Sequence, residues 1–248
     1  PLPYEYIKIA EGCSNNCSFC AIPLIRGERR SFSPESILTD ARSALDRGAV
    51  ELVLIAQDTA SYDYDGTVLS ELLYRLAELK PQLMRVMYMH PDRINKRILD
   101  AMADIACVAP YLDLPFQHAD GRILSSMNRN GNADRYLDLL SQIRETIRGI
   151  SVRSTFMVGY PGETYETIET TFQWALTLPL DDISFTIPYP LPGTRLFDKV
   201  FNVRTEIDWR YENENRITYQ SEFDESYLRS RIAEVFAQFT ARQRRKPR

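Results

Sequence analysis

The sequence predicts an α/β protein built from parallel strand–helix units. Short apolar segments rich in β-branched residues alternate with longer stretches of helical periodicity. Six such segments are separated from one another by helices, and parallel neighbouring strands need crossover connections of this kind. An open doubly wound sheet and a curved partial barrel both satisfy the pattern, and periodicity alone does not separate them.

The expected elements follow one another regularly up to residue 187. The predicted strands span residues 4–10, 51–56, 83–89, 111–114, 151–158 and 183–187. The predicted helices span residues 34–46, 69–79, 96–105, 132–147 and 164–178. The first helix has the clearest bounds, because Ser33 is a typical N-cap residue, Pro34 suits the first helical position and Gly48 suits a helix end.

The character of the chain changes after residue 195. We expect residues 1–195 to form the core domain and residues 196–248 a C-terminal extension. Within the extension, residues 222–244 are expected to form an amphipathic helix, whereas residues 203–219 show no clean period. Residues 242–248 include five basic side chains. Such a run is typical of a solvated helix end, with contact to RNA or the ribosome as the alternative.

The composition is that of an ordinary soluble globular protein. The chain has 248 residues, of which 44% are hydrophobic and 26% charged. A net charge of −4 provides no overall field that would attract nucleic acid. No apolar run approaches the roughly 20 residues that span a bilayer, and the start does not resemble a signal peptide. We therefore expect a cytoplasmic protein without membrane contact.

Three of the four cysteines, Cys13, Cys17 and Cys20, lie within eight residues. A secreted scaffold would spread its cysteines in pairs, so this is not a disulfide framework. Three close thiolates can hold a soft metal centre, but a structural zinc site would need a fourth Cys or His nearby. On an iron–sulfur cluster, three ligands leave one iron open, which favours chemistry over electron transfer. Cys107 lies in an apolar stretch and is expected to be buried outside the cluster.

Polar side chains follow the predicted strands at their carboxyl ends. Because ligands of parallel α/β folds bind at this edge, these loops are the expected site. They are the cysteine loop, Gln57-Asp58-Thr59, His90-Pro91-Asp92, Gln117-His118 and Gly159-Tyr160-Pro161-Gly162-Glu163. Either of the two histidines is a candidate general base, although a histidine in a loop is more often a hydrogen-bonded scaffold residue.

Longer strings of residues resemble the radical S-adenosylmethionine (SAM) superfamily and, within it, the methylthiotransferases. The cysteine spacing, with the aromatic Phe19 before the last cysteine, is typical of the superfamily. Residues 7–13, 21–27, 153–155 and 158–164 are similar to the methylthiotransferases. Ala56-Gln57-Asp58-Thr59 and residues 85–92 and 115–118 resemble the RimO branch, which modifies an aspartate of a small-subunit ribosomal protein. The resemblance covers roughly residues 4–180 and is highly specific.

The resemblance implies a radical SAM enzyme of the methylthiotransferase type. Its fold would be a partial (β/α)6 TIM-like barrel of parallel strands with a C-terminal helical extension. Cys13, Cys17 and Cys20 would hold a 4Fe–4S cluster whose open iron binds SAM. Reduction of that cluster would cleave SAM to methionine and a 5′-deoxyadenosyl radical, which abstracts a hydrogen from the substrate. The protein would orient this cofactor and exclude competing reactions.

The same resemblance implies roles for four further residues. Phe19 would lie beside the adenine of SAM, and Gln57 would bind its amino group. Arg153 would bind its carboxylate, and Gln117 would reach the ribose hydroxyls. The structural alternatives are packing for Phe19, capping of a turn for Gln57 and a buried salt bridge for Arg153. A charge inside a strand is costly unless it is paired, and both interpretations of Arg153 provide a pair.

The chain departs from the methylthiotransferase pattern at both ends. These enzymes usually carry an N-terminal domain with three further cysteines for a second cluster, and a C-terminal β-barrel, and this sequence shows neither. Residues 187–194 resemble other radical SAM groups, including those with cobalamin domains. Since the chain begins at Pro1 without Met, we expect either the central domain of a larger enzyme or a short relative with altered chemistry.

Several functional hypotheses follow from this resemblance. The leading one is methylthiolation of a ribosomal-protein aspartate, with flanking domains or an external electron donor as partners. A stand-alone radical SAM enzyme that performs methylation or epimerisation is the first alternative. A tRNA methylthiotransferase is the second, although the acidic body of the chain argues against it. The third is a non-enzymatic iron–sulfur electron carrier.

Overall fold

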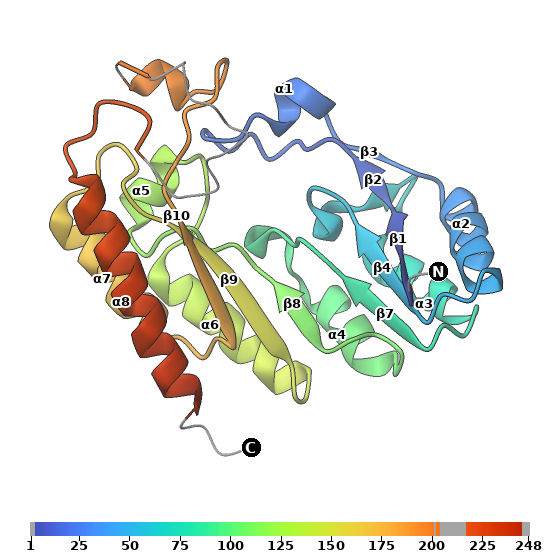
Figure 1. Cartoon of the computed structure of the whole chain (residues 1–248). Coiled ribbons are helices and arrows are strands. Elements are labelled where there is room, and N and C mark those ends of the chain that lie inside the picture. The colour runs from blue at the N-terminus through green and yellow to red at the C-terminus, as the bar shows by residue number, and fades with distance from the viewer. Residues whose placement is uncertain (1–2, 201, 204–216, 245–248) are drawn as a thin grey trace. The chain divides into compact units, whose positions relative to one another are not determined.

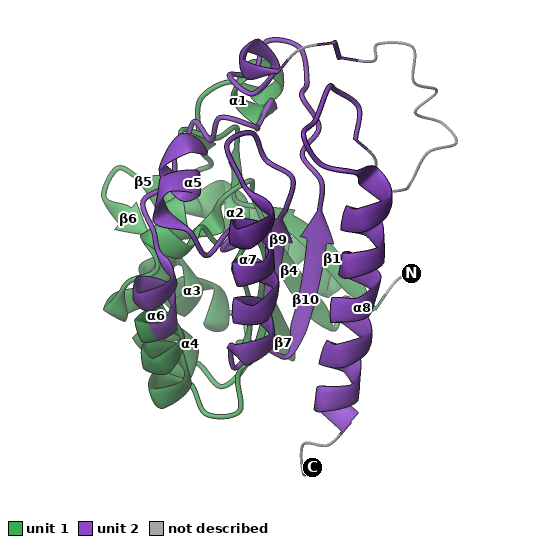
Figure 2. Ribbon diagram, turned by 90° about the vertical axis from the view of Figure 1, so that its left-hand side faces the viewer, with its two compact units in different colours: residues 1–15, 22–115, 138–153 green, residues 16–21, 116–137, 154–248 purple. Residues whose placement is uncertain are grey.

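The computed structural model describes residues 3–200, 202–203 and 217–244 (Figure 1). The chain folds into two compact units, which Figure 2 distinguishes by colour. Unit 1 comprises Pro1–Asn15, Ile22–Pro115 and Asp138–Arg153, and unit 2 comprises Asn16–Ala21, Phe116–Leu137 and Ser154–Arg248. The predicted domain boundary after residue 195 is a different division of the chain, and it stays a prediction.

Unit 1 is built on three parallel strands. β1 (Tyr4–Lys8), β4 (Glu51–Ile55) and β7 (Leu83–Val86) lie side by side in this order. The chain crosses over from β1 to β4 through α2 (Pro34–Asp46), and from β4 to β7 through α3 (Leu69–Ala77). Parallel pairing requires such crossovers, so the alternation of strands and helices in the sequence is confirmed in this unit.

A fourth strand, β8 (Tyr111–Asp113), follows β7 in unit 1. The crossover between them is α4 (Lys96–Asp104), and the Met89 N–H donates to the Asp113 carbonyl oxygen at 3.2 Å. β8 pairs in parallel with the first residues of β9 (Ser151–Met157), with Asp113 opposite Arg153. The strand ends that carry the predicted site residues Gln57 and Arg153 therefore belong to one unit.

α2 begins and ends as the sequence predicts. The Ser33 hydroxyl oxygen accepts a hydrogen bond from the Ser36 N–H at 3.2 Å, and Pro34 is the first helical residue. At the other end, Gly48 has a φ of +92°, a left-handed conformation that glycine adopts without strain. The buried side of α2 carries Ile37, Ala41 and Ala44, and the two alanines let the helix pack closely against β1.

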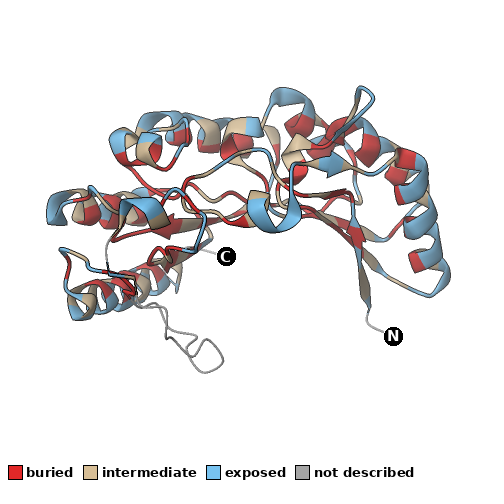
Figure 3. Cartoon of the chain, turned by 90° about the horizontal axis from the view of Figure 1, so that it is seen from above, coloured by how far each residue is buried: buried red, intermediate tan, exposed pale blue. Residues whose placement is uncertain are grey.

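α3 and α4 pack against each other through apolar stripes. Leu72, Leu73 and Leu76 of α3 are fully buried, and Ile98 and Leu99 of α4 are 3% exposed. Figure 3 shows the buried residues of the helices on one side of each helix and the exposed residues on the other. Burial of one such side chain contributes about 1.5–3 kcal/mol, so these stripes hold the helices of unit 1 in place.

Unit 2 contains the second half of β9, β10 (Asp182–Thr186), α5 (Gly121–Ser126), α7 (Tyr165–Thr177) and α8 (Glu225–Arg244). β10 lies beside β9 in the sheet. Between these elements the ring of Phe185 stacks on Phe156, with 5.3 Å between centroids, and lies 5.0 Å from Phe172. Aromatic pairs of this geometry contribute beyond their buried area, so they form the centre of the core of unit 2.

Within the described residues, the predicted helices and strands are confirmed, with bounds that differ by a few residues. The predicted helix at residues 132–147 is α6 (Ala133–Thr146). The structure adds α1 (Ile22–Arg26), α5 and two ribbons of two-residue strands, β2 (Ala10–Glu11) with β3 (Arg30–Ser31) and β5 (Asp63–Tyr64) with β6 (Thr67–Val68). All of these are too short to show a period. Residues 204–216 and 245–248 lie outside the described residues, including most of the aperiodic segment and part of the basic run. Within the described ranges, no helix is long and apolar enough to cross a membrane.

α8 is attached to α7 by a charged contact beside its apolar face. Arg231 donates to both carboxylate oxygens of Glu169, from Nε at 2.7 Å and from Nη2 at 2.6 Å, and the Tyr227 hydroxyl donates at 2.7 Å. These bonds, chiefly those from Arg231, hold the pKa of Glu169 below its ordinary value. Arg242, from the basic run, donates from Nη2 to the Leu178 carbonyl oxygen at 2.8 Å and so caps the end of α7.

Replacing Glu169 by alanine should therefore lower the free energy of unfolding by about 1–2 kcal/mol, because a bidentate, partly buried pair is lost. The folded-state pKa of Glu169 lies below its unfolded value of 4.5, so this contribution is present above that pH and is lost as the pH falls through the folded pKa. Urea unfolding at about pH 7 and about pH 3 measures this. Arg231→Lys keeps the charge without the bidentate geometry, so it should lower the free energy of unfolding by less than Glu169→Ala does. An effect of Glu169→Ala that is the same at both pH values would contradict a stabilising ion pair at Glu169.

Candidate functional site

The three clustered cysteines are divided between the two units. Cys13 belongs to unit 1, and Cys17 and Cys20 belong to unit 2. All three are half-buried cysteines that form no disulfide. Among the described residues, no three His, Cys, Asp or Glu side chains approach closely enough to hold one metal ion. In an iron–sulfur cluster each cysteine binds its own iron, so its ligands stay farther apart than those of a single ion.

In unit 1, close backbone packing holds the start of the cysteine loop. The Cys13 N–H donates to the Gly27 carbonyl oxygen at 3.1 Å, and Ala10 pairs with Ser31 in the β2–β3 ribbon. Gly12 has a φ of +76°, and a Cβ atom at this position would overlap the carbonyl oxygen of Glu28. Only glycine fits here, so Cys13 follows a rigid ribbon.

The carboxylate of Asp58 joins three loops of unit 1. Asp58 is buried just after β4, and its Oδ2 accepts from Asn15 Nδ2 at 2.8 Å. Its Oδ1 accepts from the His90 N–H at 3.0 Å, and the Nδ1 of His90 in turn accepts from the Asp92 N–H at 3.3 Å. The cysteine loop and the loops after β4 and β7 are therefore tied together. Asp58 and His90 act here as scaffold residues.

Gln57, beside Asp58, carries an unsatisfied polar atom. Its Oε1 is buried and has no hydrogen-bond partner among the described residues, so this oxygen does not cap a turn. A buried polar atom without a partner costs about 1–3 kcal/mol, and such an atom marks a place where a ligand donor fits. The amino group of SAM, which the resemblance assigns to Gln57, is a donor of this kind.

Gln117 shows the same feature in unit 2. The residue is 7% exposed, and its Oε1 also lacks a hydrogen-bond partner within the described ranges. Its backbone is left-handed, with a φ of +71°, and is held on both sides by β9. The Gln117 N–H donates to the Thr155 carbonyl oxygen at 2.9 Å, and its own carbonyl accepts from the Met157 N–H at 2.7 Å. A ribose hydroxyl is a donor that fits the buried oxygen.

Ser18 holds the second half of the cysteine loop inside unit 2. Its hydroxyl lies 2.7 Å from the Tyr160 hydroxyl and donates to the Ser126 carbonyl oxygen at 3.0 Å. Its N–H donates to the Met127 carbonyl oxygen at 3.0 Å. Burial raises the pKa of Tyr160, which keeps the phenol neutral. The segment from Cys17 to Cys20 is therefore anchored between its two thiols.

Arg129 places a positive charge beside this segment, which the sequence analysis missed. Its side chain is buried, and Nη1 lies 3.9 Å from the Sγ of Cys17. A guanidinium beside a thiol favours the thiolate, which is the form that binds metals. The residues around Arg129 carry no periodic or motif signal, so only the long-range fold could reveal this contact.

His118 and Glu163 form a fully buried pair in unit 2. The His118 Nδ1 accepts from the Asp120 N–H at 2.9 Å, so the ring proton is on Nε2 and points to Glu163 Oε1 at 2.7 Å. The other oxygen of Glu163 accepts from the Tyr160 N–H. Burial raises the pKa of Glu163. Because both ring nitrogens are engaged, His118 positions the Gly159–Glu163 turn and is not available as a general base.

Arg153 pairs with a carboxylate on the neighbouring strand. Its Nη1 lies 3.1 Å and 3.2 Å from the two carboxylate oxygens of Asp113, directly across the β8–β9 register. This is the salt bridge that the sequence analysis left open as the alternative. The pairing with the SAM carboxylate stays a prediction, because one guanidinium carries five donors and can bind more than one acceptor.

Phe19 and Cys107 are both half-buried. Half-burial of Phe19 is compatible with packing and with a contact to adenine, so that contact stays a prediction. Cys107 was expected to be buried and is only half-buried, because Val108 and Ala109 are the residues that turn inward where the chain bridges to Met84. Burial nevertheless raises the pKa of the Cys107 thiol, which disfavours the metal-binding thiolate.

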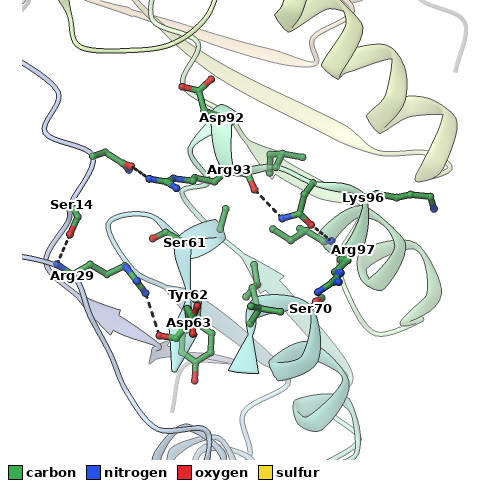
Figure 4. A pocket seen from close by; sticks show the side chains of 17 residues that line it. Ser14, Arg29, Ser61, Tyr62, Asp63, Ser70, Asp92, Arg93, Lys96 and Arg97 are labelled. Atoms are coloured by element: carbon green, nitrogen blue, oxygen red, sulfur yellow. Dashed lines mark hydrogen bonds between the residues drawn. The ribbon is translucent and has the colours of Figure 1, made fainter. Parts of the chain in front are cut away.

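Described residues of unit 1 line a larger and a smaller cleft. The larger has a volume of about 750 Å³ and is lined by Ser14 and Asn15 of the cysteine loop and by the segments that lead into α3 and α4 (Figure 4). Arg29, Arg93 and Arg97 border it, and none of the three forms an ion pair with a described residue. The smaller cleft has a volume of about 420 Å³ and lies on one face of β1, β4 and β7.

The buried pair yields a direct test of its scaffold role. Glu163→Gln should lower the free energy of unfolding by about 1–3 kcal/mol, because the amide NH₂ would face a ring N–H of His118 or leave the Tyr160 N–H unsatisfied. Urea unfolding measures this loss. Glu166→Gln, at an exposed position in the first turn of the following helix α7, should change stability by less than about 0.5 kcal/mol. Equal stability of the two variants would contradict the hydrogen-bonding scheme.

Comparison of the sequence with known proteins identifies similar enzymes. The chain is 39% identical over 207 residues to the ribosomal protein uS12 methylthiotransferase RimO of Heliobacterium modesticaldum, covering 81% of this chain and 45% of that protein. It is 36% identical to the protein of the same name from Thermotoga maritima, covering 91% of this chain and 53% of that protein. The chain thus spans about half the length of the curated relatives it matches.

Solved structures show the same fold at low sequence identity. The radical SAM methyltransferase TsrM from Kitasatospora setae matches 95% of this chain and 52% of its own, with a TM-score of 0.72 and 16% identity. The coproporphyrinogen III oxidase HemN from Escherichia coli matches 95% of this chain and 53% of its own, with a TM-score of 0.66 and 17% identity. These likenesses confirm the predicted fold class, an α/β partial barrel of parallel strands.

The sequence profile of the radical SAM superfamily matches residues 7–175, which include all three clustered cysteines and the residues Gln57, Gln117 and Arg153. This match covers more than half of the chain. The chain therefore belongs to the radical SAM superfamily.

Proposed function

We propose that this chain forms the radical SAM part of a methylthiotransferase that modifies an aspartate of ribosomal protein uS12. The observation that carries the proposal is an identity of 36–42% to proteins named uS12 methylthiotransferases. Because the chain spans about half of their length, the complete reaction is proposed to need flanking domains as partners. The substrate is proposed to be a ribosomal protein and the compartment the cytoplasm.

Cys13, Cys17 and Cys20 are proposed to hold a 4Fe–4S cluster to which SAM binds. Together the bound cluster and SAM supply a 5′-deoxyadenosyl radical through one-electron cleavage of SAM to methionine. Three cysteines outside any disulfide are a donor set that suits such a cluster. Arg129 would stabilise the thiolate of Cys17 from its position 3.9 Å away.

The two glutamines with unsatisfied oxygens support SAM binding. Gln57 would accept from the SAM ammonium group and Gln117 from the ribose, and each would gain the hydrogen bond that it lacks among the described residues. Arg153, positioned by Asp113, would bind the carboxylate. Phe19 would cover the adenine. Asp58 and Ser18 would keep the two halves of the cysteine loop in place without touching the cofactor.

We further infer that the external electron donor is an acidic redox protein that docks at the cleft of Figure 4. The donor must approach the cysteine loop, and Ser14 and Asn15 of that loop line this cleft. Arg29 borders the cleft from one segment of the chain, and Arg93 and Arg97 border it from a second, with Asp63 and Asp92 as the acidic residues of the lining. Arginines that form no ion pair within the described part of the chain attract carboxylates, and charge complementarity of this kind accelerates encounter between proteins.

The proposed function is tested with chain reconstituted anaerobically with iron and sulfide. The wild type should show cluster absorption, release 5′-deoxyadenosine from SAM under dithionite, and bind about three or four irons. Cys17→Ala should lose the absorption and the release, whereas Cys107→Ala should keep both. With flanking domains present, mass spectrometry of uS12 should find the gain of one sulfur and one methyl group.

Other outcomes of this experiment favour other functions. A cluster that leaves SAM intact would favour the electron carrier. A gain of a methyl group without sulfur, or an isomerised residue, would favour a stand-alone radical SAM enzyme. Methylthiolated tRNA with unmodified uS12 would favour the tRNA enzyme. Each of these results would overturn the proposed substrate or reaction.

The docking of the donor is tested through its dependence on salt. With an acidic flavoprotein as donor, the rate of 5′-deoxyadenosine release should fall severalfold between about 0.05 M and about 0.3 M NaCl, because the Debye length shortens. Arg93→Ala combined with Arg97→Ala should reduce this dependence. Lys80→Ala, an exposed cation outside the cleft, should leave it as in the wild type. Equal salt dependence in all three proteins would exclude docking at this cleft.

A further inference from the structure

Tyr88, just after β7, has a backbone conformation that a bulky residue rarely adopts. Its φ is +58°, in the left-handed region, and its side chain is 51% exposed. In this region the Cβ of an L-residue crowds its own backbone, so non-glycine residues remain there only when their surroundings hold them. An exposed tyrosine gains little from burial that would offset this strain.

The neighbours of Tyr88 hold its backbone on every side. Thr59 is fully buried, and its N–H donates to the Tyr88 carbonyl oxygen at 3.0 Å while its hydroxyl donates to the Met87 carbonyl oxygen at 2.8 Å. The Met87 N–H donates to the Leu54 carbonyl oxygen at 3.1 Å, and the Met89 N–H donates to β8. The residues before and after Tyr88 are thus fixed to neighbouring strands, and the strained residue is pinned between them.

The ring of Tyr88 borders the smaller cleft of unit 1. This cleft of about 420 Å³ is lined by Tyr4, Tyr6, Glu51, Val53, Ile55, Arg85, Met87 and Tyr88. Its walls are mostly carbon, and its two charges neutralise each other, since Arg85 Nε donates to Glu51 Oε1 at 2.6 Å. The volume lies within the range of small ligand sites, and the lining suits an apolar group. β1, β4 and β7, which carry most of this lining, lie next to each other in Figure 1.

The cleft lies on the face of β4 that leads along the strand toward Gln57. Side chains on a strand alternate between its two faces, so Glu51, Val53 and Ile55 lie on one face of β4. Gln57 is the next position of this alternation, and its Oε1 is the buried oxygen without a partner in the described part of the chain. A group that enters the cleft beside Tyr88 therefore comes close to the end of β4 at which SAM is proposed to bind.

We propose that this cleft is the subsite for an apolar side chain of the protein substrate, next to the residue that is modified, and that Tyr88 is its substrate-contacting residue. The inference rests on the proposed function and goes beyond it by assigning substrate recognition to this face. Two exposed rings, Tyr6 at 62% and Tyr88 at 51%, supply aromatic surface at the edge of the cleft. Such rings are the side chains that most often dominate protein recognition. The strain at Tyr88 fixes the position of its ring before the substrate arrives.

The test replaces residues that have left-handed backbone by glycine. It measures the effect of backbone strain through stability and the effect of the ring through substrate binding. The reconstituted full chain is titrated with purified uS12. The fluorescence of a label on uS12 gives Kd, and the uS12-dependent release of 5′-deoxyadenosine gives KM. Tyr88→Gly should raise both constants about tenfold, as expected for loss of an aromatic contact residue. Its Tm should stay within about 3 °C of the wild type or rise, because glycine relieves the strain. Tyr88→Phe, which keeps the ring, should change Kd by less than about threefold.

Two matched controls complete the design. Lys80 has a φ of +56° and is exposed at the end of α3, so Lys80→Gly relieves a similar strain far from the cleft. It should raise the Tm by about 1–3 °C with unchanged Kd. Tyr74 is 46% exposed on α3, outside the cleft, so Tyr74→Ala removes an exposed ring without effect on Kd.

The possible failures are distinguishable. A wild-type Kd in Tyr88→Gly, while the wild type binds uS12, would overturn the inference alone. A Tm loss above about 6 °C in Tyr88→Gly would identify the ring as structural packing and would also overturn it. If the wild-type chain neither binds uS12 nor responds to it, the proposed substrate fails, and the inference fails with it.

Discussion

Parallel pairing of β1, β4 and β7 is the constraint on which the architecture of unit 1 depends. Each strand must be followed by a crossover, so the loops after the strands all leave at one edge of the sheet. At that edge the buried carboxylate of Asp58 accepts hydrogen bonds from Asn15 and from the backbone of His90. One side chain thus connects the cysteine loop, the loop of Gln57 and the loop of Tyr88. A change in strand register would separate all of these groups at once.

Buried polar atoms distinguish residues that support the fold from residues that are proposed to bind a ligand. The carboxylates of Asp58 and Glu163 are buried, but each accepts several hydrogen bonds, so they stabilise turns and strand ends. The oxygens of Gln57 and Gln117 accept none from the described residues. Native structures leave few buried polar atoms unsatisfied, and those few need a reason. A cofactor with an ammonium group and ribose hydroxyls provides such a reason for both glutamines.

The periodicity of the sequence was sufficient to predict the strands and helices, because apolar spacing reflects local geometry. Ser33, Pro34 and Gly48 marked the ends of α2 correctly, since capping depends on neighbouring residues only. Motifs predict ligand-binding roles for Gln57 and Gln117, and these roles stay predictions. The site was not predictable where a contact joins residues far apart in sequence. Arg129 beside Cys17, and His118 against Glu163, are separated by 112 and 45 positions, and no local pattern records such pairs.

Two of the non-glycine residues with left-handed backbone, Tyr88 and Gln117, follow strands at positions where function is proposed. Tyr88 comes shortly after β7 and Gln117 shortly after β8, and each is held by hydrogen bonds from a neighbouring strand or turn. Glycine at either position would adopt the same backbone without strain. The side chain therefore gives these positions something that glycine cannot, a carbonyl oxygen at Gln117 and an aromatic ring at Tyr88. Because a strained residue persists only where the surrounding fold holds it, the strand-end hydrogen bonds and the proposed ligand contacts belong to one arrangement.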